Sequence, residues 1–531
     1  MQATTNPFYY LTHFHQALDW LSLREGLLAP EDALWIACFR RQSQDTQALL
    51  IRLTMRSPAH FRISRLDYPE IDVTAAVNNL TDLGWVSQDH LLTPSEAFHL
   101  LRKAELDALY GTQPTKQAHW LTLAGSPDQS FHQWTQQHDC LTLMVRDQLD
   151  RLRLAFFGNL HQGWESFVLE ELGITRFPKV TMDLSCGFED QQEFESCWQA
   201  HQLSEQWEIV KTQTQVPTTL IEKALALPAQ GPSLKRLRSK LLASMARYAE
   251  RQEQYEPSLS LLGESSADEA RLRSIRCLEK AGQPEQAWRL AVQTRCFYQS
   301  DAERDGVFRM LPRLSKALGR SWPRIPRYQP NSVEVFTELN CRPEPAAAQW
   351  LDRDGGISLF SENRLFTTLF TLHFWDVIYA PIPGAFFHPF QAAPADLQHP
   401  DFVSKRSQLW NKGFEQLKTD SGRQILWNYH RRFGTTARGV DWRLSAEDIE
   451  LALHCISTNH LSIIFQRILL GHRKGMPDLI RFFPEQKSYE LVEVKGPGDA
   501  LQPHQREWLR YFDQHGIPNR VCWIRDLADA V

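Results

Sequence analysis

Hydrophobic residues recur at helical spacing along most of the chain and form short β-rich runs in only a few places. The residues that share one helix face near the N-terminus are Phe8, Leu11, Phe14, Leu18 and Leu21. Helical spacing returns between residues 233 and 320. Residues 49–53, which are apolar except for Arg52, are expected to form a strand, and so are residues 520–525, whereas residues 333–339 are expected to be helical. The pattern predicts a mostly α-helical protein with a C-terminal α/β region.

Two β-rich runs joined by a polar turn lie near the C-terminal end. Residues 479–483 form the first run, residues 484–488 the turn, and residues 489–495 the second run, which ends at a Gly-Pro-Gly loop. This arrangement predicts a β-hairpin. Because side chains alternate along a strand, Glu493 and Lys495 should project from the same side of the second strand.

Asp478 stands at the start of the first strand, where the hairpin should bring it close to Glu493 and Lys495. A charged pair at the end of a buried strand is costly unless it has partners or a metal. Carboxylates suit Mg²⁺ or Mn²⁺, which would polarise a phosphodiester and activate a water, while the lysine orients that water or offsets charge. Glu-x-Lys alone would more often be a structural ion pair. The whole pattern of Pro-Asp, hairpin, Glu-Val-Lys and Gly-Pro-Gly favours a metal site.

A helix upstream carries a further acid on a mostly apolar stripe. Ser361 is a good N-cap for a helix that begins with Glu362. Glu362 shares its stripe with Phe366, Leu369 and His373. The helix dipole stabilises an acid in the first turn, and this alone would account for Glu362.

Two more helices are predicted to flank the hairpin. Residues 448–470 should form one long helix, followed by Arg473 and Lys474, which lie close enough to the hairpin to approach a phosphate. After the Gly-Pro-Gly loop, Gln505 shares the packing face of the last helix. A polar residue on a face that covers the catalytic strands needs a partner. Gln505 is therefore expected to position the water or the lysine.

Composition limits the class of protein. A chain of 531 residues is too long for one ordinary core, so several domains are expected. The net charge of −5 means that DNA binding would depend on local basic patches. The nine cysteines are dispersed and form no Cys-x-x-Cys, which suits a reducing cytoplasm. Neither a signal peptide nor a long apolar run is apparent, so no membrane span is expected.

The motifs carry a family resemblance. Gly-Met-Pro-Asp-Leu, then Leu-Val-Glu-Val-Lys-Gly-Pro-Gly-Asp, then Gln-Arg-Glu-Trp-Leu resemble the VRR-NUC domain, a branch of the PD-(D/E)xK nucleases. The whole chain resembles the bacterial form of the Fanconi-associated nuclease family. The resemblance implies metal ligation by Glu362, Asp478, Glu493 and the Val494 carbonyl, with Lys495 assisting the attacking water. It implies dependence on Mg²⁺ or Mn²⁺, and no small-molecule cofactor is expected.

The resemblance and the residue patterns together predict four domains. These are a winged-helix-like domain at 1–90, a SAP-like DNA-binding module at 91–150, a helical tetratricopeptide-like domain at 151–335, and a VRR-NUC domain at 336–531 with a helical insertion at 380–445. In the family, a basic pocket receives a DNA 5′ end. The residues matched to it are Arg236, Lys240, Arg271, Arg273 and Arg276. A solvated helix face would explain the same charges.

These expectations describe a metal-dependent, structure-selective DNA nuclease. The resemblance implies 5′-flap endonuclease and 5′-to-3′ exonuclease activity on branched DNA in interstrand crosslink repair, in the cytoplasm and associated with the nucleoid. Two alternatives stay open. One is a Holliday-junction or restriction-type nuclease, and the other is a non-catalytic scaffold that binds DNA junctions.

Overall fold

A computed structural model describes residues 6–24, 26–56, 59–182, 185–212, 218–323, 328–337, 342–420 and 422–527. Contacts divide the chain into two units. Unit 1 is Met1–Phe177 with Met182–Phe194 and Phe386–Phe390, and unit 2 is Pro178–Thr181 with Glu195–Ala385 and Gln391–Val531. The finer four-domain division stays a prediction.

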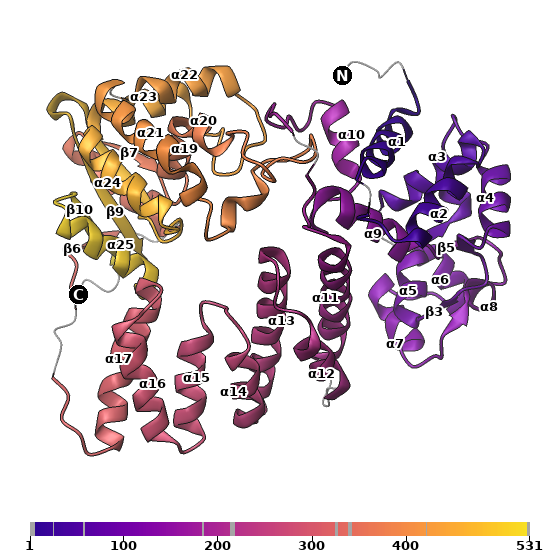
Figure 1. Ribbon diagram of the computed structural model, residues 1–531, viewed down its shortest axis with the longest axis horizontal. Coiled ribbons are helices and arrows are strands. Elements are labelled where there is room, and N and C mark those ends of the chain that lie inside the picture. Colours follow the sequence, from indigo (N-terminus) through magenta and orange to yellow (C-terminus); the bar gives the residue numbers. More distant parts are fainter. Residues whose placement is uncertain are drawn as a thin grey trace. The chain divides into compact units, whose positions relative to one another are not determined.

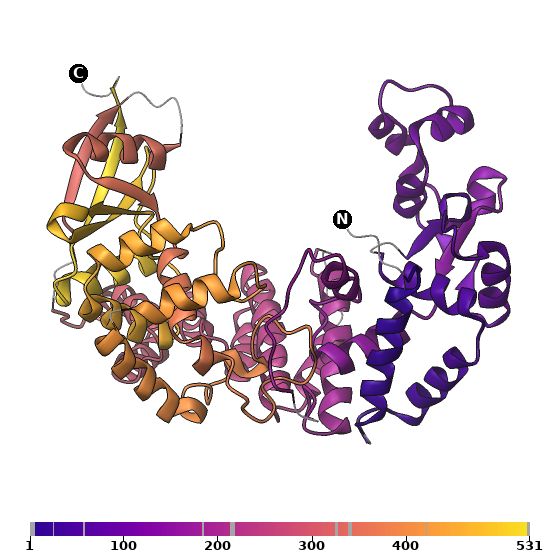
Figure 2. The same cartoon turned by 90° about the horizontal axis from the view of Figure 1, so that it is seen from above.

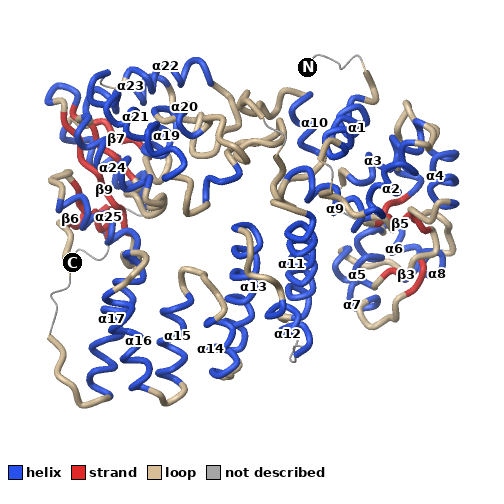
Figure 3. Tube along the Cα trace, viewed as in Figure 1, coloured by secondary structure: helices blue, strands red, loops and turns tan. Residues whose placement is uncertain are grey.

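Unit 1 consists of short helices around small sheets (Figure 3). Its helices are α1 (Tyr9–Ser22), α2 (Pro30–Arg40), α3 (Gln44–Thr54), α4 (Val73–Asp82), α5 (Pro94–Leu100), α6 (Lys103–Tyr110), α7 (Trp120–Leu123), α8 (Phe131–Thr135), α9 (Arg146–Phe157) and α10 (Glu165–Glu171). A three-stranded sheet has the order β1 (His60–Arg62), β5 (Cys140–Leu143), β2 (Val86–Ser87), and β3 (Leu91–Leu92) pairs with β4 (Gln129–Ser130).

The run at residues 49–53 is helical, so its prediction as a strand is wrong. It lies within α3, where Leu49, Leu50, Ile51 and Leu53 are all buried. A short run rich in apolar residues can belong to a buried helix as well as to a buried strand. Ser43 decides between them, because its side chain accepts a hydrogen bond from the backbone N–H of Thr46 and caps the helix.

Unit 2 begins with helices that lie side by side (Figure 1). They are α11 (Gln191–Val210), α12 (Thr218–Ala226), α13 (Pro232–Arg251), α14 (Tyr255–Gly263), α15 (Ala270–Lys280), α16 (Pro284–Cys296) and α17 (Asp301–Ala317). Apolar residues of α15, α16 and α17, such as Ile275, Ala287 and Leu311, form one buried cluster. These helices agree with the helical spacing seen in the sequence. Helical hairpins stacked in this way make extended surfaces.

The C-terminal part of unit 2 contains a five-stranded sheet in the order β6-β10-β9-β8-β7 (Figure 2). Its strands are β6 (Ser332–Thr337), β7 (Ile357–Phe360), β8 (Leu479–Phe483), β9 (Ser488–Lys495) and β10 (Asn519–Asp526). The antiparallel β8–β9 pair confirms the predicted hairpin. The helix predicted at 333–339 is wrong, because β6 occupies its described part and pairs in parallel with β10 along its length. The β-branched residues of this run suit a strand, but its partner β10 lies far along the chain and nothing local identifies it.

Helices pack against the sheet and against one another. They are α18 (Pro343–Leu351), α19 (Leu365–His373), α20 (Trp375–Ile378), α21 (Ser407–Asp420), α22 (Arg423–Arg432), α23 (Ala446–Cys455), α24 (Thr458–Leu469) and α25 (Pro503–Gln514). The single long helix predicted at 448–470 is wrong, because α23 ends at Cys455 and Ser457 caps a new helix, α24. In the described part of the chain, helices long and apolar enough to cross a membrane do not occur.

Candidate active site

The β8–β9 hairpin places Asp478 beside the end of β9. Leu479 pairs with Val492, so Asp478, just before β8, lies next to Glu493 and Val494. The backbone N–H of Val494 donates a hydrogen bond of 2.8 Å to Asp478 Oδ2. The faces of β9 also alternate, because Val492 and Val494 belong to the apolar cluster shared with α18, whereas Glu493 is absent from it.

Glu362 reaches the same place through backbone contacts. The N–H groups of Ser361 and Glu362 both donate to the carbonyl oxygen of Asp478, at 2.9 and 3.2 Å. The Ser361 hydroxyl donates to the carbonyl oxygen of Pro477 at 3.0 Å. These bonds fix the segment that carries Glu362 beside the start of β8. They also correct a prediction, because α19 begins only at Leu365 and Glu362 lies in the preceding turn, not in the helix.

Glu493 is a deeply buried carboxylate that lacks the hydrogen bonds a buried charge needs. It is 1% exposed, and Lys495 Nζ lies 2.6 Å from Glu493 Oε1. That contact lacks hydrogen-bond geometry, and neither carboxylate oxygen has a hydrogen-bond partner of normal geometry among the described residues. Burial, followed by the charge of Asp478, raises the pKa of Glu493 to about 8.

The pKa of Asp478 is raised as well. Burial is the main cause, and the charges of Glu362 and Glu344 add to it. The Val494 N–H and Lys495 act in the opposite direction. A carboxylate that raises the pKa of a neighbouring acid repels its charge, and a cation between them would relieve this repulsion.

The donor set fits a divalent metal ion. Within the described residues, no three His, Cys, Asp or Glu side chains already form a cluster that could hold a metal. The backbone nevertheless brings Glu362, Asp478 and Glu493 together, and Glu493 has two oxygens without hydrogen bonds. Oxygen ligands of this kind are those that hard divalent cations prefer. The residues present are therefore compatible with metal binding once their side chains turn toward the ion.

Two neighbours of the site were missed by the sequence analysis. Glu344, in the first turn of α18, raises the pKa of Asp478, but the sequence analysis assigned it no role. His504, in the first turn of α25, has its pKa lowered by burial and by the charges of Lys495 and Lys474. A signal existed for His504 in the sequence, because it lies beside Gln505 on the helix that was expected to cover the site.

Three predicted site residues lie at the edges of this arrangement. Gln505 Oε1 accepts the backbone N–H of Gln502 at 2.9 Å, so the side chain caps its own helix. The burial of Arg473 and the charge of Arg438 lower the pKa of Arg473. Lys474 is exposed, and its carbonyl accepts the indole N–H of Trp508. A role for Gln505 toward water or lysine stays a prediction.

The arginines predicted to receive a DNA end differ in their surroundings. Arg271 pairs with Glu303, and both Arg273 and Arg276 pair with the buried Glu250. These three cations already have carboxylate partners. By contrast, Arg236 and Lys240 are exposed on α13, and neither has an acid partner among the described residues.

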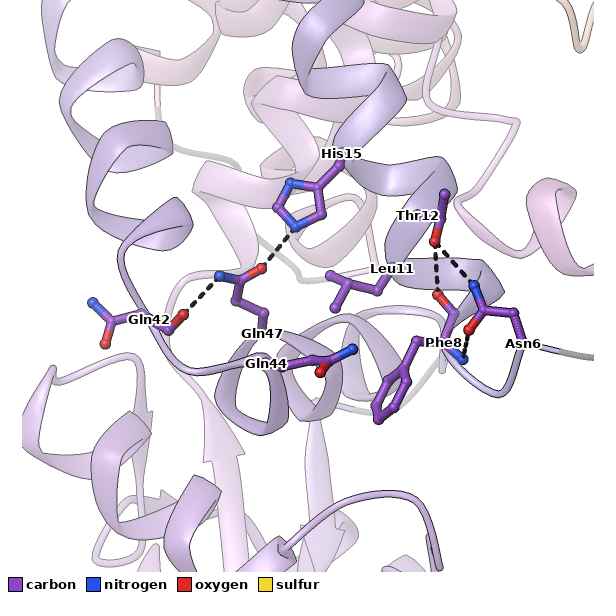
Figure 4. Close-up of a pocket in the computed structure, with 8 residues that line it drawn as sticks. All are labelled: Asn6, Phe8, Leu11, Thr12, His15, Gln42, Gln44 and Gln47. Atoms are coloured by element: carbon purple, nitrogen blue, oxygen red, sulfur yellow. Dashed lines mark hydrogen bonds between the residues drawn. The ribbon is translucent and has the colours of Figure 1, made fainter.

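A pocket of about 420 Å³ belongs to unit 1, whereas the carboxylates belong to unit 2 (Figure 4). Its lining consists of Asn6, Phe8, Leu11, Thr12, His15, Gln42, Gln44 and Gln47. Gln47 Oε1 accepts a hydrogen bond from His15 Nε2 at 2.7 Å, and Gln47 Nε2 donates to the carbonyl oxygen of Gln42 at 2.8 Å. These bonds join α1 to α3, so we assign the pocket's amides to structure and not to chemistry.

Comparisons with known proteins agree with the geometry. Residues 418–525 match the model of the VRR-NUC domain, and residues 8–87 match that of the "FAN1, HTH domain". Glu362 and Glu344 lie outside the first match.

The similarity extends over the whole chain. A Fanconi-associated nuclease 1 homolog of Pseudomonas aeruginosa is 36% identical over 98% of this chain and 97% of its own length. An Arabidopsis thaliana homolog of the same name is 24% identical over 94% of this chain and 65% of its own length. The crystal structure of paFAN1 bound to DNA with a two-nucleotide 5′ flap and a gap has a TM-score of 0.89 and 35% identity, covering 99% of both chains.

Proposed function

The chain belongs to the Fanconi-associated nuclease family, and from this premise we propose that it cuts branched DNA near 5′ flaps at the site around Asp478. It is a structure-selective DNA nuclease that depends on a divalent metal. We propose Mg²⁺ or Mn²⁺ as the ion and 5′-to-3′ trimming of DNA as a second activity. The proposed setting is interstrand crosslink repair, with the protein associated with the nucleoid.

One observation carries the site assignment. Asp478 binds Val494 N–H through its side chain and the segment of Glu362 through its carbonyl, so one residue ties three predicted ligands together. Glu362, Asp478, Glu493 and the Val494 carbonyl are the proposed ligands. A metal held there would supply a Lewis acid for the phosphate and an acidified water for attack.

The remaining residues act on substrate and water. Lys495, beside Glu493, is suited to orient the attacking water and to offset the charge that develops on the phosphate. Arg473 and Lys474 precede Asp478 and are proposed to hold the DNA backbone on the approach to the site. Arg236 and Lys240 are better candidates for a DNA-end pocket than Arg271, Arg273 and Arg276, because only the former pair has no carboxylate partner in the described structure.

The test is cleavage of an end-labelled 5′-flap duplex in Mn²⁺ or Mg²⁺. We expect cutting near the junction by the wild type, none in EDTA, and none by Glu493→Gln. The matched control is Glu490→Gln on the same strand, because Glu490 lies on the opposite face of β9 and pairs with Arg520. Cleavage by Glu490→Gln but not by Glu493→Gln would separate the site from general damage to β9.

The same assay distinguishes the two alternative functions. A Holliday-junction or restriction-type nuclease would cut a four-way junction or plain duplex in preference to the flap. A non-catalytic scaffold would bind the flap in both metals without cutting it. Either result would overturn the proposal.

A further inference from the structure

Helix α22, labelled in Figure 1, carries exposed cationic and aromatic side chains. Its sequence, RQILWNYHRR, contains no acid. Ile425, Asn428 and Tyr429 point inward and are buried. Arg423, Trp427 and Arg431 are exposed and follow one another at intervals of four residues, so they form a single stripe along the helix.

The cations of this stripe lack carboxylate partners. Among the described residues, no ion pair involves Arg423 or Arg431, although other arginines of unit 2, such as Arg406 and Arg520, are paired. The helix dipole would account for Arg431, which lies in the last turn. It cannot account for Arg423, because a cation at the first residue of a helix is opposed by the dipole. Arg423 is therefore not explained by the stability of its own helix.

Aromatic side chains share this surface. Trp427 is 48% exposed, and Phe433, just beyond the helix, is 52% exposed. The Arg431 guanidinium lies over the Trp427 ring, 4.7 Å from its centroid. Aromatic rings flanked by arginines make stacking platforms for nucleobases, and the guanidiniums can contact the adjoining phosphates.

The chain that leaves α22 leads to the candidate active site. Asp441 donates its backbone N–H to Thr368 on α19 at 2.9 Å, and its carboxylate accepts from Arg364 Nε at 2.5 Å. Arg364 is two residues beyond Glu362. Phe433 precedes Asp441 by eight residues, so the two lie at most about 29 Å apart. Both belong to unit 2, so a DNA strand leaving the carboxylates could reach the stripe.

We propose that the exposed stripe Arg423–Trp427–Arg431, with Phe433, binds the unpaired strand of a branched DNA substrate. The proposal rests on the proposed nuclease function and adds a site for single-stranded DNA outside the metal-binding carboxylates. The aromatic residues decide between occupants, because only unpaired bases can stack on them, whereas a duplex would need cations alone. Positive charge on a chain of net charge −5 agrees with an anionic partner.

The test is DNA binding in EDTA, measured by fluorescence anisotropy with two substrates. One is a 5′-flap duplex with a long unpaired arm, and the other is a nicked duplex of the same sequence without the arm. Trp427→Ala and Arg423→Glu should each weaken binding of the flap substrate on the order of tenfold and leave the nicked duplex nearly unchanged. Trp427→Phe, which keeps a stacking ring, should restore most of the loss.

Two features make the result decisive. An acid at the first residue of α22 suits the helix dipole, so Arg423→Glu should fold at least as well as the wild type. Lys487→Glu, in the exposed β8–β9 turn, makes the same change of charge and serves as the control. Unchanged flap binding, or an equal loss on the nicked duplex, would overturn the proposal.

Failure of the nuclease assignment would look different. If the wild type does not cut flap DNA in Mn²⁺ but Trp427→Ala selectively loses affinity for the arm, the DNA-binding stripe stands and the proposed function falls. If the wild type cuts flap DNA and both stripe variants bind it as the wild type does, the proposed function stands and the DNA-binding stripe falls.

Discussion

Asp478 Oδ2 accepts the backbone N–H of Val494 at 2.8 Å, so a predicted metal ligand is fixed by a strand that carries two others. The bond spans the β8–β9 pair at the end where Glu493 and Lys495 lie. It constrains the carboxylate before any metal arrives, which is the kind of preorganisation that catalysis by charge requires.

The first prediction concerns Asp478. Asp478→Ala removes both the negative charge and the acceptor for Val494, whereas Asp478→Asn removes only the charge. Both variants should lower the cleavage rate on the order of 10³-fold or more, because metal ligands act as a unit. Thermal unfolding should separate them, since Asp478→Asn keeps the hydrogen bond and should melt near the wild-type temperature. Appreciable cleavage by either variant would place the chemistry elsewhere.

The second prediction concerns the pH dependence of stability without metal. The pKa of Glu493 is about 8 in the folded protein, above the value of 4.5 for an ordinary glutamate. The folded state therefore holds a proton that the unfolded state has lost between these pH values. The free energy of unfolding should fall as pH rises from about 5 to 8, by at most about 1.4 kcal/mol per pH unit from this group. The raised pKa of Asp478 acts in the same direction.

Calorimetry in EDTA at several pH values measures this slope. Glu493→Gln should flatten it and raise the melting temperature near pH 8, whereas Glu490→Gln should not. Mg²⁺ or Mn²⁺ should restore the stability of the wild type at pH 8. Parallel curves for the wild type and Glu493→Gln would contradict the assignment of the proton to Glu493.

The third prediction concerns Gly475, three residues before Asp478, and the space around it. Gly475 has φ of +88°, and a Cβ there would lie 2.4 Å from His504 Cδ2 and 2.9 Å from the His504 carbonyl carbon. Gly475→Ala should therefore displace α25 and lower both the melting temperature and the cleavage rate. Gly471→Ala is the matched control, because Gly471 also has positive φ, +98°, but has open space around it. Its cost should be the backbone strain alone, about 1–3 kcal/mol. Equal effects of the two substitutions would mean that the contact with His504 does not matter.

Sequence reasoning succeeded where the structure is local. The β8–β9 hairpin needs only alternation and a turn, so Asp478, Glu493 and Lys495 could be brought together without knowledge of the rest of the fold. Glu362 is a different case, because hydrogen bonds to Asp478, far along the chain, hold its segment in place. Only the family resemblance pointed to it.

Three features that the sequence analysis did not foresee share one cause, whereas the wrong strand at residues 49–53 and the missed helix break at Ser457 are local. Residues 333–337 form β6 because β10 pairs with them, and nothing in their own sequence records this partner. Glu344 was missed for the same reason, since its effect on Asp478 depends on how α18 packs against the sheet. The pairing of Arg273 and Arg276 with Glu250 of α13 likewise depends on the stacking of helices. Long-range contacts decide all three.

The last prediction separates two roles of Lys495, which lies 2.6 Å from Glu493 Oε1 and is 8% exposed. Its charge lowers the pKa of Glu493 against the opposing effects of burial and Asp478. Lys495→Met keeps the buried stem but loses the charge, so the pKa of Glu493 should rise further and a metal ion should have to displace a more tightly held proton. Mn²⁺ binding by calorimetry at pH 7.5 should weaken and should recover at higher pH.

Lys495→Arg is the paired variant, because it keeps the charge and changes only the shape of the donor. Its Mn²⁺ affinity at pH 7.5 should stay close to that of the wild type, while its cleavage rate should fall because a guanidinium cannot take the ammonium's place beside the water. Metal affinity therefore reports the electrostatic role, and cleavage at saturating metal reports the role toward water. If Lys495→Met binds Mn²⁺ like the wild type at pH 7.5, the lysine does not tune Glu493, and its contribution lies in the chemical step alone.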